Sequence, residues 1–270
     1  MTAKFPEYTR VVAERDGEIV GTATINSHHG GLYEPHRYWV GSATHEQHRH
    51  TGVDNAMIEA LLEHVQAVQP EQLWTYIRED FVPMVEFLDA FNFNEEFRSW
   101  GSHLDVQAFD MDAYLPQKQE LEAEGIRFCS YLELDEANRE RDLVSFHKQI
   151  EEDVPFYEPI IPKERDDIRE DNIPDESCFV ALDGNTIVGM ASLDTCVEGL
   201  LQNGLTGVHR DYRNRGIATV LKALVASYAK TQGEVDINAA GSGENQAMRH
   251  VNEKLGYMIE PAWITFKAVL

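Results

Sequence analysis

The chain has 270 residues, and its 47 acidic against 23 basic side chains give a formal net charge of -24 at pH 7. Such a field repels phosphate backbones and anionic lipids, which argues against nucleic acid or a membrane surface as the main partner and favours a cationic or amine substrate. The alternative interpretation is that the acidic excess only keeps the protein soluble. The length suffices for one large or two modest domains, each with a core of its own.

Signals for secretion, membrane insertion or a disulfide framework are missing from the sequence. The three cysteines lack CxxC spacing, and no apolar core with a cleavage site precedes Lys4. No apolar run approaches the ~20 residues that span a bilayer. We therefore expect a cytoplasmic protein without a disulfide or a zinc site.

The first predicted elements form a β-hairpin. Strands are expected at 8–15 and 18–25, joined at Asp16-Gly17, a dipeptide typical of tight hairpin turns. The same device returns at 178–182 and 186–193, again around Asp-Gly. This similarity prompts a search for an internal repeat.

Between the two hairpins, residues 110–125 are polar, contain Pro116 and lack a clear apolar period. We interpret them as the link between two domains, residues 1–115 and 116–270.

The second domain is expected to open with a strand over 126–134 and a helix over 135–152. Asp135 is the predicted N-cap of that helix, and one of its faces carries Leu143, Phe146, His147 and Ile150. A Pro-bounded aromatic loop at 155–159 and an acidic-basic helix at 163–170 follow.

The best-defined stretch covers residues 205–229. A short β-branched run leads into a polar turn, and apolar side chains then recur on one face of a helix: Ile217, Val220, Leu221, Leu224, Val225 and Tyr228. The turn precedes the helix start, where unpaired backbone N–H groups and the positive end of the helix dipole point outward. Gly216 permits a backbone conformation that a side chain would forbid, and the small Ala218 lets a ligand approach the main chain. We therefore predict an anion-binding site at this turn.

After this helix we predict a strand at 234–238, a flexible turn at 239–243, a second helix at 244–254 and a closing strand at 263–269. This order of elements fits an α/β fold, of α+β type, built on a mixed sheet.

Two motifs in this region resemble those of a known family. The spacing R-x-x-G-x-A after a strand ending in Val resembles the pyrophosphate loop of the GNAT superfamily of acyl-CoA-dependent N-acyltransferases. Residues 244–257 (ENQAMRHVNEKLGY) resemble that family's second motif, a helix with an Asn near its start and a Leu-Gly-aromatic exit. Because the two motifs occur in this order, with a predicted strand between them, the signal is specific.

A copy of the pattern lies 164 residues earlier. Residues 45–52 align with 209–216, which places His45 on His209, Arg49 on Arg213 and Gly52 on Gly216. The offset continues along the following helix and beyond it, where Met84 falls on Met248 and Phe93 on Tyr257. We therefore predict two tandem GNAT-like acyl-CoA N-acyltransferase domains.

The two copies are not equivalent. Asp54 in the first copy replaces Ala218, and Phe81 replaces Asn245. A carboxylate beside a bound pyrophosphate is repulsive, so we expect the first CoA site to be inactive. The trio His45, His48 and His50 suggests a metal site, but its counterpart loop has one His, so we expect no metal.

The resemblance implies acetyl-CoA as acyl donor. Backbone N–H groups from Arg213 to Thr219 would hold the pyrophosphate, and Lys222 would join the nearby arginines in offsetting its charge. Strand main chain near Thr206 and Val208 would pair with pantetheine. The expected acetyl-CoA-binding residues are Thr206, Val208, Arg210, Arg213, Asn214, Arg215, Gly216, Ile217, Ala218, Thr219, Asn245 and Met248.

Acetyl transfer by direct attack needs a neutral amine, so a base must take a proton from the ammonium form. The resemblance assigns the Val208 N–H as donor to the developing oxyanion. Many GNATs carry a carboxylate on the strand that corresponds to 201–208, where this chain has Gln202 and Asn203. The nearest carboxylates in sequence are Asp194, Glu198 and Glu158, and nothing in the sequence selects among them.

Many family members protonate the departing thiolate with a Tyr, at the position that Asn252 occupies here. Asn is no general acid. Either Tyr257 or Tyr212 substitutes for the missing Tyr, or the thiolate departs without help.

Three hypotheses follow. The first is an N-acetyltransferase acting on a small amine, with acceptor specificity set by the region after the strand at 126–134. The second is a pseudoenzyme that binds CoA thioesters or a protein partner without catalysis. In the third, the apolar surface of the first half only mediates homodimer formation.

Overall fold

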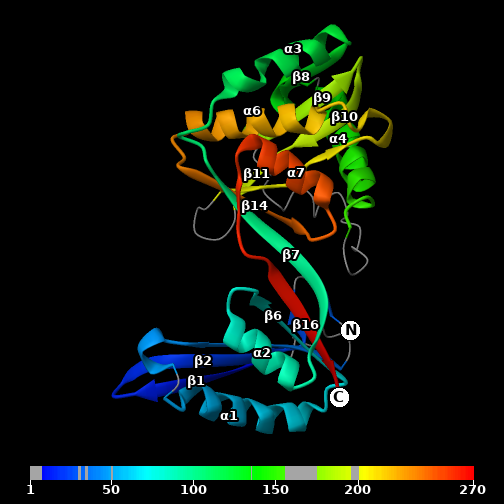
Figure 1. Cartoon of the computed structure of the whole chain (residues 1–270). Helices are drawn as coiled ribbons and strands as arrows, with labels where there is room; N and C mark the ends of the chain where they lie inside the picture. Colours follow the sequence, from blue (N-terminus) through cyan, green and yellow to red (C-terminus); the bar gives the residue numbers. More distant parts are fainter. Residues whose placement is uncertain are drawn as a thin grey trace. The chain divides into compact units, whose positions relative to one another are not determined.

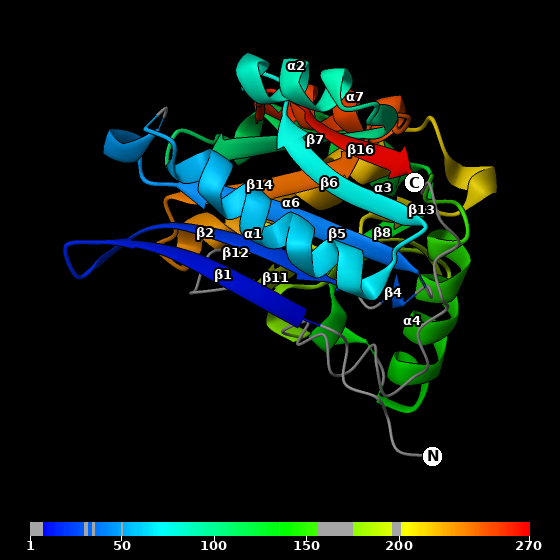
Figure 2. The same ribbon diagram turned by 90° about the horizontal axis from the view of Figure 1, so that it is seen from below.

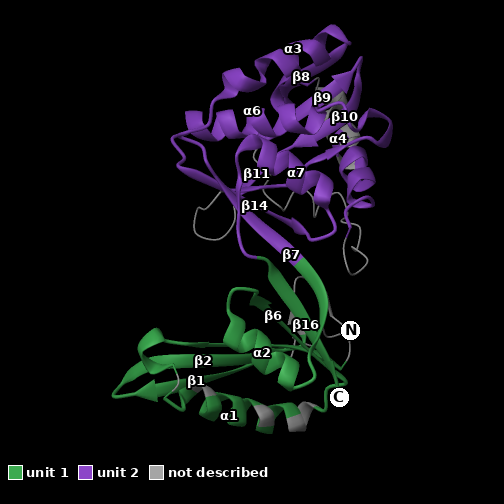
Figure 3. Cartoon of the chain, in the orientation of Figure 1, with its two compact units in different colours: residues 1–98, 262–270 green, residues 99–261 purple. Residues whose placement is uncertain are grey.

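The computed structural model describes residues 8–29, 32–33, 36–49, 51–134, 136–155, 175–195 and 201–270. The chain divides into two compact units (Figure 3). Unit 1 comprises residues 1–98 together with 262–270, and unit 2 comprises residues 99–261. In the parts of the chain that the structure describes, no helix is both long and apolar enough to span a membrane.

Unit 1 is an α/β unit on a mixed sheet (Figure 1). Its elements are β1 (Tyr8–Arg15), β2 (Glu18–Asn26), β3 (His28–His29), β4 (Leu32–Tyr33), β5 (Arg37–Thr44), α1 (Val53–Val68), β6 (Gln72–Arg78), α2 (Val82–Ala90), the first part of β7 (Asn94–Asp105) and β16 (Trp263–Val269). The sheet runs in the order β1-β2-β5-β6-β16. Strands β5 and β6 are parallel, whereas β1–β2, β2–β5 and β6–β16 are antiparallel.

The core of unit 1 lies where α1 packs on the sheet. Helix α1 lies against β2 and β5 (Figure 2), and Met57 and Leu61 of the helix pack on Ala23 and Ile25 of β2. Gly21 makes this close approach possible, because a Cβ there would lie 2.8 Å from the Met57 sulfur. The hairpin predicted at 8–15 and 18–25 is confirmed by β1 and β2.

Unit 2 contains the rest of β7 and two sheets. Its further elements are α3 (Leu115–Ala123), β8 (Ile126–Ser130), α4 (Glu136–Glu151), β9 (Phe179–Asp183), β10 (Thr186–Ala191), β11 (Leu193–Thr195), β12 (Leu201–Asn203), β13 (Gly207–Val208), α6 (Ile217–Thr231), β14 (Asp236–Ser242), α7 (Gln246–Leu255) and β15 (Met258–Ile259). One sheet has the order β8-β9-β10-β13 and is antiparallel. In the other, β14 lies between β7 and β12, β11 pairs with β12, and β15 pairs with β7.

Helix α6 is the centre of the unit 2 core. It contacts β9, β10, α3 and α7, and Val220, Leu221, Val225 and Ala229 are fully buried. The predicted apolar helix face is therefore present, although Leu224 and Tyr228 are only partly buried. Helix α4 buries the predicted face of Leu143, Phe146, His147 and Ile150, while Asp135, its predicted N-cap, lies outside the described residues.

Residues 110–125, interpreted as the link between two domains, form a 3-10 turn and α3, because Pro116 falls in the first helical turn, where its missing N–H costs nothing, and Leu121 is buried. Two other predicted element boundaries are wrong. The strand expected at 126–134 ends at Ser130, whose hydroxyl accepts from the N–H of Leu132 in a 3-10 turn. Residues 239–242, expected to form a flexible turn, continue β14, because they pair with 99–102 of β7.

The internal repeat is confirmed in the backbone of the two loops. Gly52 and Gly216 both have φ 88° and begin α1 and α6. The His45 and His209 rings each accept from the N–H two residues on, which starts a 3-10 turn in both copies. The offset of 164 also holds at α2 and α7, which begin after Phe81 and Asn245 respectively.

Candidate functional site

The turn before α6 has the geometry of an anion-binding site. Gly216 is in the left-handed conformation, as is Asn214 with φ 62°, and the helix begins at Ile217. Gly216, the N-cap residue, has no side chain to cap the helix, so the first-turn N–H groups, at Ile217, Ala218 and Thr219, have no partner within the helix. These groups and the positive end of the helix dipole favour a bound anion such as a phosphate.

Next to this turn, the chain crosses from one sheet of unit 2 to the other. Strand β12 pairs with β14 at Gln202, and β13 pairs with β10 at Gly207 and Val208. The N–H of His209 donates to the carbonyl of Val188 in β10 at 2.9 Å. Because successive N–H groups of a strand point to opposite edges, the N–H of Val208 points away from β10, on the edge of β13 that no described strand covers.

One polar group close to Val208 in sequence lacks a partner among the described residues. The buried Thr206 hydroxyl has no hydrogen-bond partner among the residues that the structure describes. A buried polar group without a partner is rare and is explained by a ligand or water. Asn245 caps α7, where its side-chain oxygen accepts from the N–H of Met248 at 3.1 Å.

The arginines of the turn are already paired with carboxylates. Arg210 donates from Nε to both Asp153 oxygens, at 2.9 and 3.1 Å, and Arg213 also contacts Asp153. These guanidinium groups lower the pKa of Asp153, with the hydrogen bond from Arg210 as the main cause. Arg215 pairs with Glu124 at 2.5 Å. Any anion bound here therefore shares these guanidinium groups with carboxylates.

Helix α3 adds a side chain that the sequence did not suggest. Gln117 lies against the Cα of Gly216, so that a Cβ at position 216 would overlap its amide. The Lys254 ammonium of α7 donates to the Gln117 oxygen at 3.4 Å. The turn is thus bordered by α3, which belongs to the segment interpreted from sequence as the link between two domains. No sequence signal points to Gln117 or to Asp153.

Lys222 does not take part in the anion site, so its predicted role is wrong. Its side chain, on α6, is buried in the protein interior, and its amine donates to the Asn203 side-chain oxygen at 2.8 Å. Burial lowers the pKa of Lys222 to about 7. The Asn203 amide in turn donates to the Tyr257 hydroxyl at 2.7 Å and to the carbonyl of Asn238 at 3.1 Å.

The two tyrosines considered as general acids, and the Asn at the position of the family's Tyr, lie in different environments. Tyr257 is buried, and burial raises the pKa of its hydroxyl. Tyr212 donates to Asp183 at 2.7 Å, which raises the Tyr212 pKa. Asn252 is fully buried, with its amide nitrogen 3.4 Å from the Ser102 hydroxyl, and its side-chain oxygen has no partner among the described residues.

Of the three candidate bases, Glu158 and Glu198 lie outside the described residues. Asp194, on β11, lies against Gly204 in the segment that joins β12 to β13. A Cβ built on Gly204 would be 2.5 Å from the Asp194 Oδ1. The Asp194 carboxylate therefore fills the space that a side chain at position 204 would take.

The cysteines can be located in part. Cys129 and Cys178 are buried free thiols, and burial raises the pKa of Cys129. Cys196 lies outside the described residues. No group of three or more His, Cys, Asp or Glu side chains close enough to hold a metal ion occurs in the described ranges.

Comparison with known proteins gives the family. The model of the acetyltransferase (GNAT) family matches residues 2–93 and 145–257. No curated protein matches the chain.

Solved structures with the same fold span most of the chain. A GCN5-related N-acetyltransferase from Sphaerobacter thermophilus is 16% identical, with a TM-score of 0.64, over 94% of this chain and 78% of that one. A tandem GNAT protein from the clavulanic acid biosynthesis pathway is 17% identical, with a TM-score of 0.61, over 98% and 83%. A GNAT-family acetyltransferase from Colwellia psychrerythraea is 10% identical, with a TM-score of 0.61, over 97% and 85%.

At these identities the structural matches show the fold alone, whereas the family model matches sequence in both halves of the chain. The repeated loop geometry at Gly52 and Gly216 agrees with that match. The chain therefore belongs to the acetyltransferase (GNAT) family, as a tandem member with two GNAT-like regions and a fold that supports acyl transfer.

Proposed function

We propose that this protein is an N-acetyltransferase that transfers the acetyl group of acetyl-CoA to an amine of a small molecule, by direct attack in a ternary complex at unit 2. The observation that carries the proposal is the Val208 N–H, which points outward from the free edge of β13, in the same stretch of chain as the uncapped start of α6. One N–H is free to bond a thioester oxygen, and the first-turn N–H groups of α6 are free to bond an anion. A thioester joined to a diphosphate needs both features.

The chain's own groups divide the binding between them. The first-turn N–H groups at Ile217, Ala218 and Thr219 hold the pyrophosphate, with charge supplied by Arg210, Arg213 and Arg215. The Thr206 hydroxyl and the adjoining main chain bond the pantetheine arm, and Asn245 and Met248 border it at the start of α7.

In the chemical step, the amine nitrogen attacks the thioester carbonyl carbon, and the carbon–sulfur bond breaks. The Val208 N–H stabilises the negative charge that develops on the carbonyl oxygen. Asp194 takes the proton from the ammonium form, through water. Its place against Gly204 supports this choice, because a carboxylate there faces the segment that leads to Val208. CoA leaves as a thiolate, whose pKa is low enough for departure without a general acid.

The acceptor we propose is a small cationic amine in a cytoplasmic setting. The net charge of -24 attracts cations and repels nucleic acid and anionic lipid. The first unit serves as a scaffold without its own acetyl-CoA, because Asp54 and Phe81 replace Ala218 and Asn245.

The rival proposal is a pseudoenzyme that binds CoA thioesters without turnover. One observation favours it: Asn252, at the position of the family's Tyr acid, is fully buried against Ser102.

Two measurements separate the proposals. Calorimetry with acetyl-CoA should find one site per chain, abolished by Ala218→Asp, which copies Asp54 of the first region, and unchanged by Asp54→Ala. A thiol-release assay with a panel of small amines should then show turnover. Binding without turnover on any amine supports the pseudoenzyme, and two binding sites contradict the assignment of unit 1.

A further inference from the structure

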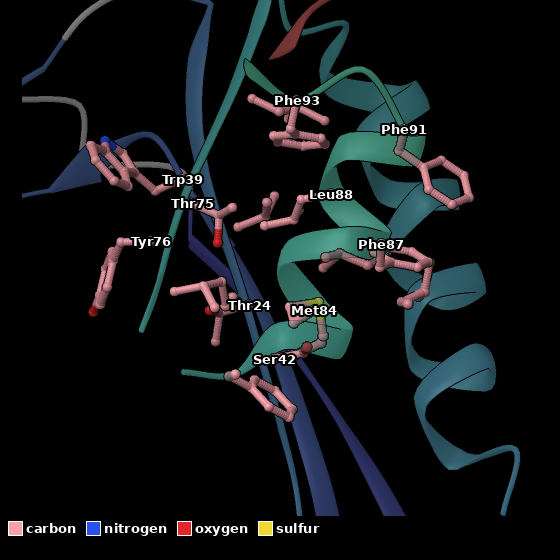
Figure 4. Close-up of a pocket in the computed structure, with 18 of the residues that line it drawn as sticks. Thr24, Trp39, Ser42, Thr75, Tyr76, Met84, Phe87, Leu88, Phe91 and Phe93 are labelled. Atoms are coloured by element: carbon pink, nitrogen blue, oxygen red, sulfur yellow. The ribbon is translucent and has the colours of Figure 1, made fainter. Parts of the chain in front are cut away.

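Unit 1 contains a cavity of its own, at an opening in its sheet. The pairing of β5 with β6 is confined, in the described residues, to 37–39 and 72–74. Beyond these residues, β5 stays with β2 and β6 stays with β16. A cavity of about 520 Å³ lies at this opening, bounded by the strands, α1 and α2 (Figure 4). This volume is within the range of small-molecule sites, roughly 300–1,000 Å³.

At three positions the cavity lining is apolar, whereas the corresponding residues of unit 2 are polar. At the offset of 164, Phe81 stands for Asn245, Leu88 for Asn252 and Phe93 for Tyr257. Figure 4 shows Leu88 and Phe93 between α2 and the strands. Each change replaces a polar side chain by an apolar one, so the cavity favours the transfer of apolar surface from water.

The rim of the cavity exposes aromatic side chains. Phe81, Phe87 and Phe91 of the α2 region are 42%, 37% and 61% exposed, and all three line the cavity. Exposed apolar patches of this kind mark binding sites in soluble proteins.

A cation lies next to one of these aromatic rings. The Arg49 guanidinium is 5.9 Å from the centre of the Phe81 ring, and its Nε donates to the Thr44 carbonyl at 3.4 Å. Its counterpart Arg213 makes the matching bond to Val208 but is also paired with Asp153. Among the side chains that the structure describes, no carboxylate pairs with Arg49. The charge of Arg49 is therefore available to an anionic head group at the edge of the cavity.

We propose that the cavity of unit 1 binds a small apolar carboxylate, with its hydrocarbon part between α2 and the opened strands and its head group at Arg49. A fatty carboxylate has both features. The site is independent of the acetyl-CoA site proposed for unit 2, and each can fail without the other.

The test is calorimetry of the full chain with octanoate, decanoate and dodecanoate. One site per chain is expected, with affinity rising about fourfold for each added methylene until the cavity is full. Dodecanol, which has the same chain without charge, should bind several-fold more weakly than dodecanoate. Arg49→Gln should remove that difference without changing dodecanol binding. If none of the three carboxylates binds, the proposal is wrong.

Three variants locate the site. Leu88→Asn restores the residue of the second region and should weaken dodecanoate at least tenfold. Ser42→Phe fills the cavity from an exposed position. It should also weaken dodecanoate binding at least tenfold, without harming the fold. Val12→Asn, an exposed β1 residue that does not line the cavity, is the control and should bind normally. Unchanged binding in both cavity variants would overturn the proposal.

Two other occupants are also tested. Displacement of dodecanoate by acetyl-CoA in Ala218→Asp would make the cavity a CoA site. Dimerisation can be measured by sedimentation. If dodecanoate binding is lost as the protein dimerises, a second copy of the chain covers the rim. Either result contradicts the proposal.

Discussion

Gln117 lies directly against Gly216, while at Gly52, the counterpart of Gly216, no described residue other than its chain neighbours comes within 4 Å of where its Cβ would be. Both glycines have φ 88°. The pair therefore separates two reasons for a glycine in this loop, a left-handed backbone and the lack of space for a side chain.

We predict that Gly52→Ala lowers the free energy of unfolding by about 1–2 kcal/mol, the cost of a left-handed conformation. Gly216→Ala should cost roughly 1 kcal/mol more, since Gln117 must also move. Adding Gln117→Ala to Gly216→Ala should bring the loss back to that of Gly52→Ala. Urea unfolding of the wild type, the two single glycine variants and the double variant measures these free energies. Equal losses for both single glycine variants would show that the Gln117 contact is irrelevant.

Asp194→Asn should lower kcat by about 10²–10³ with little change in acetyl-CoA affinity, because an amide cannot accept the ammonium proton. Raising the pH should partly restore the rate, since more of the amine is then neutral. The measurements are the pH profile of kcat and acetyl-CoA calorimetry. Glu120→Gln, at an exposed α3 position, is the matched control. A pH profile identical to that of the wild type would exclude Asp194 as the base.

Lys222 makes stability depend on pH. Its pKa is about 7 in the folded protein and near 10.4 when unfolded, so between these values the unfolded chain binds more protons and stability rises with pH. We expect a gain on the order of 2 kcal/mol from pH 7 to 9. Lys222→Met should lack this gain, although it also loses the bond to Asn203, a loss that does not vary with pH.

Urea unfolding at both pH values, with Lys230→Met as control, measures the gain. Lys230 is exposed on the same helix and donates to the Phe109 carbonyl. If wild type and Lys222→Met change in parallel between pH 7 and 9, the lysine is charged in the folded protein.

Asp153→Asn should tighten acetyl-CoA binding several-fold at low salt, because Arg210 and Arg213 lose the carboxylate that now occupies them. The gain should shrink as ionic strength rises. Asp211→Asn removes the same charge from an exposed neighbour in the loop and should have a smaller effect. Weaker binding in Asp153→Asn would instead mean that Asp153 positions the arginines for the ligand.

Local signals were enough to predict much of the fold. The Asp-Gly hairpins, the apolar period of α6 and the helix that follows Asn245 depend on residues close in sequence, and each is present in the structure. The repeat could also be found, because an offset of 164 preserves both the left-handed glycine and the helix after it. The sequence by itself therefore determined the family and the position of the glycine turn before α6.

Strand pairing was decided only by the tertiary structure. The closing strand β16, predicted at the end of the second copy, pairs with β6 inside unit 1. In unit 2, residues 99–105 of β7 pair with β14 and so extend it through residues expected to form a turn. A strand's own residues specify which face is buried but not which of several compatible edges it joins.

The surroundings of single polar side chains were also decided by the tertiary structure. Lys222 is buried because α6 is covered on several sides, by β9, β10, α3 and α7. Helical periodicity predicts one buried face and cannot anticipate this. In the same way, only folding brings Asp194 against Gly204 and Gln117 against Gly216. The sequence determined which groups this protein can use, and the packing of distant segments decided which of them meet.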